Sequence, residues 1–250
     1  MTIDTLKIRL QEELPGAASH LKMAPAHRLE EFRAIRDKDF NPRLSAVLVL
    51  LYPDDAGSTK LAGQTSFVDA PSSDATSYQH SNKNIVAPSS ENSSPPLSTL
   101  KIIFIRRGEY VGIHSGQIAF PGGRYEEHDG DLRVTAMREV EEEIGVSRDS
   151  YEIIGQLTDL YVPPSNFLVR AYVAYASRRP SYTPDPREVQ EVIELDLSHF
   201  FNSTNIKVKD FPAHNSLNNT SAPYFDVEGV TIWGATAMML TELVDLTVNG

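Results

Sequence analysis

Residues 136–146 read AMREVEEEIGV, and four of the five residues from Glu139 to Glu143 are glutamates. On a helix, residues three and four apart are neighbours, so Glu139 faces both Glu142 and Glu143. Like charges at that spacing destabilise a helix by roughly 0.2–0.5 kcal/mol per pair. Gly145 is a helix stop signal, so the cluster also lies at the negative end of the helix dipole, which adds roughly 0.3–1 kcal/mol per exposed charge. The pattern indicates that a cation normally occupies this place.

The same stretch has one apolar face. With Leu132 placed at zero and about 100° per residue, one apolar stripe of roughly 140° contains Ala136, Met137, Val140 and Ile144. Glu139, Glu142 and Glu143 converge at the border of this stripe, whereas Glu141 points away. Carboxylates on one rigid face suit Mg²⁺ or Mn²⁺, which prefer hard oxygen ligands. The alternative interpretation is an ordinary solvated acidic helix face.

The residues before this helix favour the first interpretation. Residues 114–146, HSGQIAFPGGRYEEHDGDLRVTAMREVEEEIGV, resemble the signature of the Nudix hydrolases. From Arg138 to Val146 the chain matches the second half of that signature at every fixed position. The general pattern has an acid eight residues before the arginine, where this chain has Gly130. Asp129, one place earlier, can supply the acid if the loop carries one extra residue.

This longer loop, together with SGQIAFPGG at 115–123, is similar to the coenzyme A pyrophosphatase branch of the family. That branch has an apolar run ending in an arginine, a second arginine five residues later, and then a Gly-x-x-x-Phe-Pro-Gly-Gly motif. The chain keeps Arg107 and the Phe-Pro-Gly-Gly motif, but Gly112 stands where the second arginine is expected. If that arginine contacts the phosphates of coenzyme A, its absence puts the identity of the substrate in doubt but not the type of reaction.

The resemblance implies an α/β protein, a Nudix-type α/β/α sandwich with a mixed β-sheet. It also implies a Mg²⁺- or Mn²⁺-dependent pyrophosphohydrolase that cleaves coenzyme A or acyl-CoA to 3′,5′-ADP and (acyl-)4′-phosphopantetheine. Two alternatives stay open. The same chemistry can act on ADP-ribose or NADH, or a Nudix-fold module can sense a nucleotide without hydrolysing it.

The resemblance carries roles over to individual positions. The catalytic residues it implies are Arg138, Glu139, Glu142 and Glu143. The three glutamates are the expected metal ligands, and the arginine orients one of them through a salt bridge. Arg107 is the expected phosphate clamp, and Gly122 and Gly123 allow the close backbone approach that the loop before the helix needs.

The general base is not settled by the motif. In some Nudix enzymes it is a glutamate from a later loop, and PREVQEVIEL at 186–195 offers Glu188 and Glu191. The alternative for both is a solvated entry into a strand. His114 can donate to a phosphate, although a lone histidine is more often structural. Asp129 can equally cap the helix that starts near Leu132.

Composition limits the partners. The formal net charge of −11 argues against nucleic acid or an anionic membrane, because phosphate backbones are held by Lys and Arg. The absence of cysteine excludes disulfides and thiolate chemistry. No apolar run reaches the roughly 20 residues of a membrane span, and no signal peptide is evident. We expect a cytoplasmic protein that binds a small CoA-like nucleotide, and a homodimer by analogy with relatives.

Residues 1–43 are expected to form an N-terminal helical extension, with one helix ending at Pro15–Gly16 and another near 29–35. The Nudix domain then covers 44–250. A flexible Ser/Asn/Pro-rich insertion at 54–98 interrupts it; the alternative there is a folded lid with a strand at 65–70. The two strands beside the insertion, 44–52 and 100–107, should pair as a hairpin.

Further strands are expected in four stretches, namely 116–120, 151–162, 167–177 and 189–197. A short turn is expected at 198–200. Residues 222–234 read as a hairpin around a Glu228–Gly229 turn. An amphipathic helix at 234–246 should end the fold.

Overall fold

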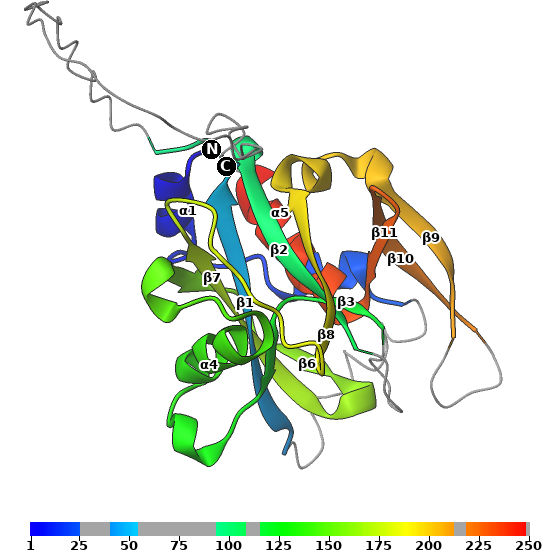
Figure 1. Cartoon of the computed structure of the whole chain (residues 1–250). Coiled ribbons are helices and arrows are strands. Elements are labelled where there is room, and N and C mark those ends of the chain that lie inside the picture. The colour runs from blue at the N-terminus through cyan, green and yellow to red at the C-terminus, as the bar shows by residue number, and fades with distance from the viewer. Residues whose placement is uncertain (26–40, 55–93, 109–115, 213–218, 249–250) are drawn as a thin grey trace, which may run out of the picture.

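The computed structural model describes residues 1–25, 41–54, 94–108, 116–212 and 219–248 (Figure 1). The expected helix near 29–35 lies outside the described residues, as does nearly all of the expected insertion at 54–98, including the alternative lid strand.

The centre of the molecule is an eight-stranded mixed sheet in the order β3-β2-β1-β7-β5, with β4 paired to β1, β6 to β7 and β8 to β2. Its strands are β1 (Arg43–Pro53), β2 (Leu100–Arg107), β3 (Ile118–Ala119), β4 (Gly122–Arg124), β5 (Glu152–Gln156), β6 (Leu160–Val162), β7 (Phe167–Tyr175) and β8 (Val189–Asp196). β1 runs parallel to β7 along its length. It also pairs antiparallel with β2, with Leu51 opposite Ile102, so the predicted hairpin across the insertion is confirmed.

The two faces of β1 bury different helices. Residues such as Leu48 and Leu50 join one core cluster with α4 (Leu132–Ile144), whereas Val49 and Leu51 join the other with α5 (Gly234–Val248). A strand buried on both faces reads as a continuous apolar run, which is why the sequence showed no alternation here. Helices therefore lie on both sides of the sheet (Figure 1), and the predicted α/β/α sandwich with a mixed sheet is confirmed.

The N-terminal segment packs into the α5 side of this core. It contains α1 (Ile3–Arg9), α2 (Ala17–His20) and the 3₁₀ turn η1 (Leu21–Met23). The prediction of one helix reaching Pro15 is wrong, because α1 ends with Leu10 as its C-cap. The chain turns there, which buries Leu10 and brings the Gly16 N–H within 3.1 Å of the carboxylate of Glu242 on α5. Tertiary packing has overridden helical propensity.

A smaller three-stranded sheet lies beside the sandwich (Figure 1). Its order is β11-β10-β9, with β9 (Ile206–Phe211), β10 (Thr220–Val227) and β11 (Val230–Trp233). The predicted hairpin is confirmed: Glu228 and Gly229 link β10 to β11 with φ values of 51° and 79°, the left-handed region that such turns need. The remaining 3₁₀ turns are η4 (Leu97–Thr99), η5 (Glu127–Asp129), η6 (Arg148–Ser150), η7 (Pro163–Ser165), η8 (Leu197–Phe201) and η9 (Ser203–Asn205).

α4 begins and ends where its sequence signals lie. The Asp131 carboxylate accepts the Arg133 N–H at 2.7 Å and caps the N-terminus. Gly145 ends the helix with φ 67°, as predicted. The helix buries Ala136, Val140 and Ile144 against the sheet, so the acidic residues of the same turns stand at a fixed angle to it.

Candidate active site

Glu143 is the most deeply buried glutamate of α4, with 1% of its surface exposed. Its carboxylate accepts the Gly122 N–H at 2.8 Å and lies 3.6 Å from a guanidinium nitrogen of Arg107. Burial raises the pKa of Glu143 to about 7; Arg107 and the Gly122 N–H oppose this shift, and the charges of Glu139 and Glu188 add to it. A carboxylate in such a place is stabilised by an added positive charge.

Glu139 lies one helical turn earlier against the β4 backbone. A Cβ on Gly123 would stand 2.4 Å from the Glu139 carboxyl carbon and from both its oxygens, so any other residue at position 123 would displace the Glu139 carboxylate. Burial raises the pKa of Glu139, the Arg138 guanidinium opposes the shift, and the charges of Glu142 and Glu188 add to it.

Gly122 sits where β4 meets β1. Its φ is 151°, and a Cβ there would lie 2.4 Å from the Ala46 carbonyl oxygen and 2.5 Å from the Val47 Cα. The two glycines therefore serve different ends. Gly122 lets β4 approach β1 and aims its N–H at Glu143, whereas Gly123 makes room for the Glu139 carboxylate.

Arg138 is held by Asp129. The Arg138 Nε and Nη2 donate to the two Asp129 oxygens at 2.8 and 3.0 Å. Asp129 also accepts the Thr135 hydroxyl at 2.8 Å and the Glu126 N–H at 3.0 Å. These contacts, the Arg138 guanidinium foremost, hold the pKa of Asp129 well below its usual range. The buried acid of the signature loop is thus Asp129, one residue earlier than the general pattern, and Asp131 rather than Asp129 caps α4.

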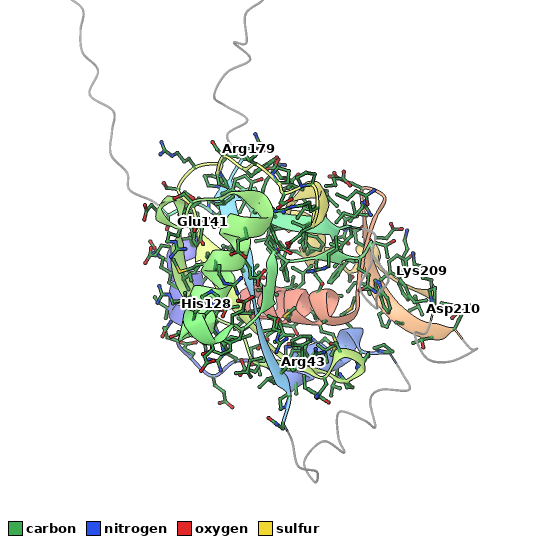
Figure 2. All side chains as sticks on the ribbon, turned by 60° about the horizontal axis from the view of Figure 1, so that its bottom comes forward. Arg43, His128, Glu141, Arg179, Lys209 and Asp210 are labelled. Carbon is green, nitrogen blue, oxygen red and sulfur yellow. The ribbon has the colours of Figure 1, made fainter. Side chains whose placement is uncertain are left out.

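Arg138 also sets two of the glutamates. Its Nη1 donates to Glu139 and to Glu142, both at 2.9 Å. The Glu142 side chain is 57% exposed, so the three predicted ligands range from buried to solvated. Among the described residues they do not form a group whose ligand oxygens all lie within 4.8 Å of one another. Glu141 points away as predicted, lies on the outer surface of α4 (Figure 2), and pairs with Arg148 at 2.7 Å.

Comparison with known proteins agrees with this geometry. The family model described as NUDIX domain matches residues 97–216, which include β4, the loop and α4. The chain belongs to the Nudix superfamily. Over 149 residues, it is 30% identical to Nudix hydrolase 22, chloroplastic, of Arabidopsis thaliana, covering 56% of this chain and 48% of that protein. The chain therefore spans about half the length of that relative.

Two further relatives are mitochondrial coenzyme A diphosphatases named NUDT8. The human protein is 29% identical over 147 residues, 58% of this chain and 62% of its own length. The mouse protein is 31% identical over 140 residues, 56% of this chain and 66% of its own length. Among solved structures, a MutT/nudix family protein from Enterococcus faecalis aligns with 93% of this chain and 73% of its own, at 11% identity and a TM-score of 0.46.

Arg107, at the end of β2, is a basic side chain that lies beside the Nudix helix. Its Nη1 lies 3.5 Å from the Gly122 carbonyl oxygen, beside its contact with Glu143. Its Nε is buried and has no hydrogen-bond partner among the described residues, and a buried unpaired donor is costly. The adjacent Arg106 is different, because its Nε donates to Glu191 at 3.0 Å.

The two candidate bases are therefore in different surroundings. Glu191 is on β8 and is engaged by Arg106. Glu188 precedes β8, and its charge adds to the raised pKa of both Glu139 and Glu143, which places it on the side of the Nudix glutamates. His114 and Gly112 lie outside the described residues.

A second group of ligand-type side chains lies away from α4. Asp196, His199 and Glu228 bring their ligand atoms within 4.8 Å of one another where η8 meets the β10–β11 turn. The His199 Nε2 lies 3.0 Å from Glu228 and 3.7 Å from Asp196, and Asp196 also accepts the Lys101 ammonium at 2.6 Å. The His199 Nε2 is buried and makes no hydrogen bond among the described residues, whereas Asp196 is paired with Lys101.

The Nudix site has the donor set that a hard divalent cation needs. Glu139 and Glu143 present carboxylate oxygens whose negative charge burial disfavours, and the chain brings Arg107 only to 3.6 Å from Glu143. Arg138 offsets part of the Glu139 charge, and the remaining carboxylate oxygens are the hard ligands that Mg²⁺ or Mn²⁺ prefer.

Proposed function

We propose that this protein is a divalent-metal-dependent Nudix pyrophosphohydrolase that cleaves the diphosphate bridge of coenzyme A or acyl-CoA. The products are 3′,5′-ADP and (acyl-)4′-phosphopantetheine. The observation that carries the proposal is the pair of carboxylates on α4, the buried Glu143 and the partly buried Glu139, each fitted to one glycine of the preceding strand. A purely structural helix has no reason to bury acids whose ionisation is opposed by their surroundings.

The residues of the site have separate roles in this reaction. Glu139, Glu142 and Glu143 would hold Mg²⁺ or Mn²⁺, which screens the diphosphate charge and lowers the pKa of a bound water. The Gly122 N–H fixes the Glu143 carboxylate. Arg138, anchored by Asp129, orients Glu139 and Glu142. Arg107, whose side chain is 28% exposed, can present the accessible part of its guanidinium to a substrate phosphate oxygen.

We assign the general base to Glu188 in preference to Glu191. A base must reach the proton that it removes. Glu188 acts electrostatically on both Glu139 and Glu143, whereas Glu191 is engaged by Arg106. Glu188→Gln should then lower kcat far more than Glu191→Gln.

The choice of substrate rests on the branch motif and on relatives. Two relatives at 29% and 31% identity carry the name coenzyme A diphosphatase. Arg107 and the Phe-Pro-Gly-Gly motif match the branch, and Gly112 departs from it. We therefore keep ADP-ribose and NADH as the comparison substrates.

The expected partner is a small nucleotide. Within the described residues no helix is both long enough and apolar enough to cross a membrane. Relatives include proteins named as chloroplastic and mitochondrial, so a cytoplasmic location stays a prediction, as does a homodimer.

The test is product analysis after incubation with coenzyme A, ADP-ribose and NADH, each with Mg²⁺, with Mn²⁺ and with EDTA. Release of 3′,5′-ADP from coenzyme A that needs the metal is the expected result. Glu143→Gln should lower kcat by a factor of about 10³ or more, because it removes a metal ligand and a charge from the site.

Glu141→Gln is the matched control, since it makes the same chemical change on the same helix. Among the described residues, the Glu141 side chain is paired only with Arg148. It should keep wild-type kcat. Metal-dependent cleavage of ADP-ribose or NADH alone would overturn the substrate and keep the chemistry. No cleavage of the three, with tight binding of one of them, would favour the sensor.

A further inference from the structure

The segment between β7 and β8 is attached to the end of the Nudix helix. The Thr183 N–H donates to the Ile144 carbonyl at 2.7 Å, and the Asp185 N–H donates to the Glu143 carbonyl at 2.9 Å. Carbonyls in the last turn of a helix have no partner within the helix. Residues 183–185 therefore cap the turn that carries Glu143.

Two glycines keep this attachment close. A Cβ on Gly145 would lie 2.9 Å from the Thr183 carbonyl oxygen and 3.2 Å from its nitrogen. At the other end of the segment, the Gly108 N–H donates to the Glu188 carbonyl at 2.7 Å. The backbone of Glu188 is thus held at the end of β2, and the segment that leads to it is held at the end of α4.

A polar cluster ties the start of the same segment to the sheet. Arg179, at the surface after β7 (Figure 2), donates to both oxygens of Glu194 on β8, at 2.9 and 2.6 Å. The Tyr182 hydroxyl donates to Glu194 at 3.0 Å and accepts from Arg179 at 2.8 Å. The hydroxyl of Tyr52, buried in β1, donates to Glu194 as well. Tyr182 directly precedes the residue that caps α4.

We propose that Tyr182 and Arg179, bound to Glu194, are positioning residues that hold segment 183–188 on α4 and thereby set the Glu188 carboxylate relative to Glu139 and Glu143. The inference rests on the proposed function, because it deepens the role given there to Glu188. Neither side chain touches the reacting atoms; both act through the backbone of the segment.

The physical reason is that the Glu188 side chain is exposed and makes no hydrogen bond or salt bridge with the described residues. A solvated side chain can be placed only by its backbone, and a displacement of about 1 Å can cost a factor of about 10² in rate. The backbone hydrogen bonds of Thr183, Asp185 and Glu188 supply that placement. The side chains bound to Glu194 hold the segment that forms these hydrogen bonds.

The test is a double-mutant cycle of Tyr182→Phe with Glu188→Gln, assayed on the substrate that the wild-type protein cleaves. Tyr182→Phe keeps the ring and removes the hydroxyl. We expect it to lower kcat by roughly tenfold with KM changed less than about twofold. In the Glu188→Gln background it should change kcat by less than about twofold, because the two residues act as one unit.

Tyr151→Phe is the matched control. Tyr151 and Tyr182 both pack against the core cluster that contains α4. The Tyr151 hydroxyl is buried and has no hydrogen-bond partner among the described residues. It should leave kcat unchanged in both backgrounds. The proposal would be overturned if Tyr182→Phe lowered kcat equally in the wild-type and Glu188→Gln backgrounds, or if it did not lower kcat at all.

Amide hydrogen exchange gives a readout that does not need activity. The Thr183 and Asp185 amides should exchange roughly tenfold faster in Tyr182→Phe than in the wild type or in Tyr151→Phe. Unchanged exchange would sink the positioning role even if the enzyme is active. If the wild type cleaves no substrate, or Glu188→Gln is too slow to assay, exchange alone decides, so failure of the proposed function is distinguishable from failure of this inference.

Discussion

Glu143 joins two demands that conflict in a single side chain. It is buried beside the Gly122 N–H that holds it in place, yet in its proposed role as a metal ligand it must be ionised. Its surroundings raise its pKa from 4.5 to about 7, chiefly through burial. Without metal, the folded protein therefore holds a proton on Glu143 more tightly than the unfolded chain does.

Because the pKa is raised on folding, the stabilisation from Glu143 is complete below about pH 4.5 and is lost as the pH rises through 7. Glu143→Gln keeps an oxygen for the Gly122 N–H and removes the charge. In EDTA, the variant should exceed the wild type in free energy of unfolding by up to about 3 kcal/mol at pH 8 and match it near pH 4.

Denaturant unfolding at the two pH values measures this difference. Glu141→Gln should show no such divergence between pH 4 and pH 8. Adding Mg²⁺ at pH 8 should stabilise the wild type and not Glu143→Gln, since the cation binds the folded state. A Glu143→Gln protein with the pH profile of the wild type would contradict the argument.

At the scale of the element, the loop before α4 is fastened to the helix by the Asp129–Arg138 pair. The Asp129 side chain is 1% exposed and that of Arg138 is 14% exposed. Asp129→Asn removes the negative charge to which two guanidinium nitrogens of Arg138 donate. It leaves the largely buried Arg138 cation without that partner. Breaking a buried ion pair from one side costs about 3 kcal/mol, and kcat should fall because Arg138 then no longer holds Glu139 and Glu142.

Asp131→Asn is the matched control for this prediction. It makes the same change two residues away on an exposed N-cap, where asparagine caps about as well as aspartate. Chemical denaturation and steady-state kinetics on both variants provide the measurement. Equal effects from the two substitutions would remove Asp129 from the site.

The α4 helix and its neighbours show what the sequence could predict. The apolar stripe of α4 and its end at Gly145 follow from local periodicity and one glycine, and both agree with the structure. The acid that binds Arg138 is Asp129, one residue before the position that the general Nudix pattern gives. The η5 turn brings Asp129 to Arg138, and the sequence alone does not show this turn. The link from Thr183 to Ile144 joins residues with no periodic relation, so no pattern along the chain could reveal it. The early end of α1 was missed for the same reason.

Across the whole molecule, the N-terminal segment and α5 are joined by buried polar contacts. Glu242 is fully buried and accepts the Thr158 hydroxyl at 2.6 Å, the His20 Nε2 at 2.8 Å and the Gly16 N–H at 3.1 Å. Ser19 and Lys22 also bind Asp245. Such a network is stable only when every member is in place, which argues that residues 1–25 fold together with the sandwich.

A substitution in α1 tests this argument. Leu6 is fully buried in the same core cluster as residues of β1, β2 and α5. Leu6→Ala should lower the free energy of unfolding of the whole protein by about 2–5 kcal/mol, in one transition with an unchanged denaturant slope. Ile8→Ala, in the same helix but 62% exposed, should cost less than about 0.5 kcal/mol. If residues 1–43 instead form an independent extension, Leu6→Ala will leave the main transition at the wild-type midpoint and produce a separate early transition.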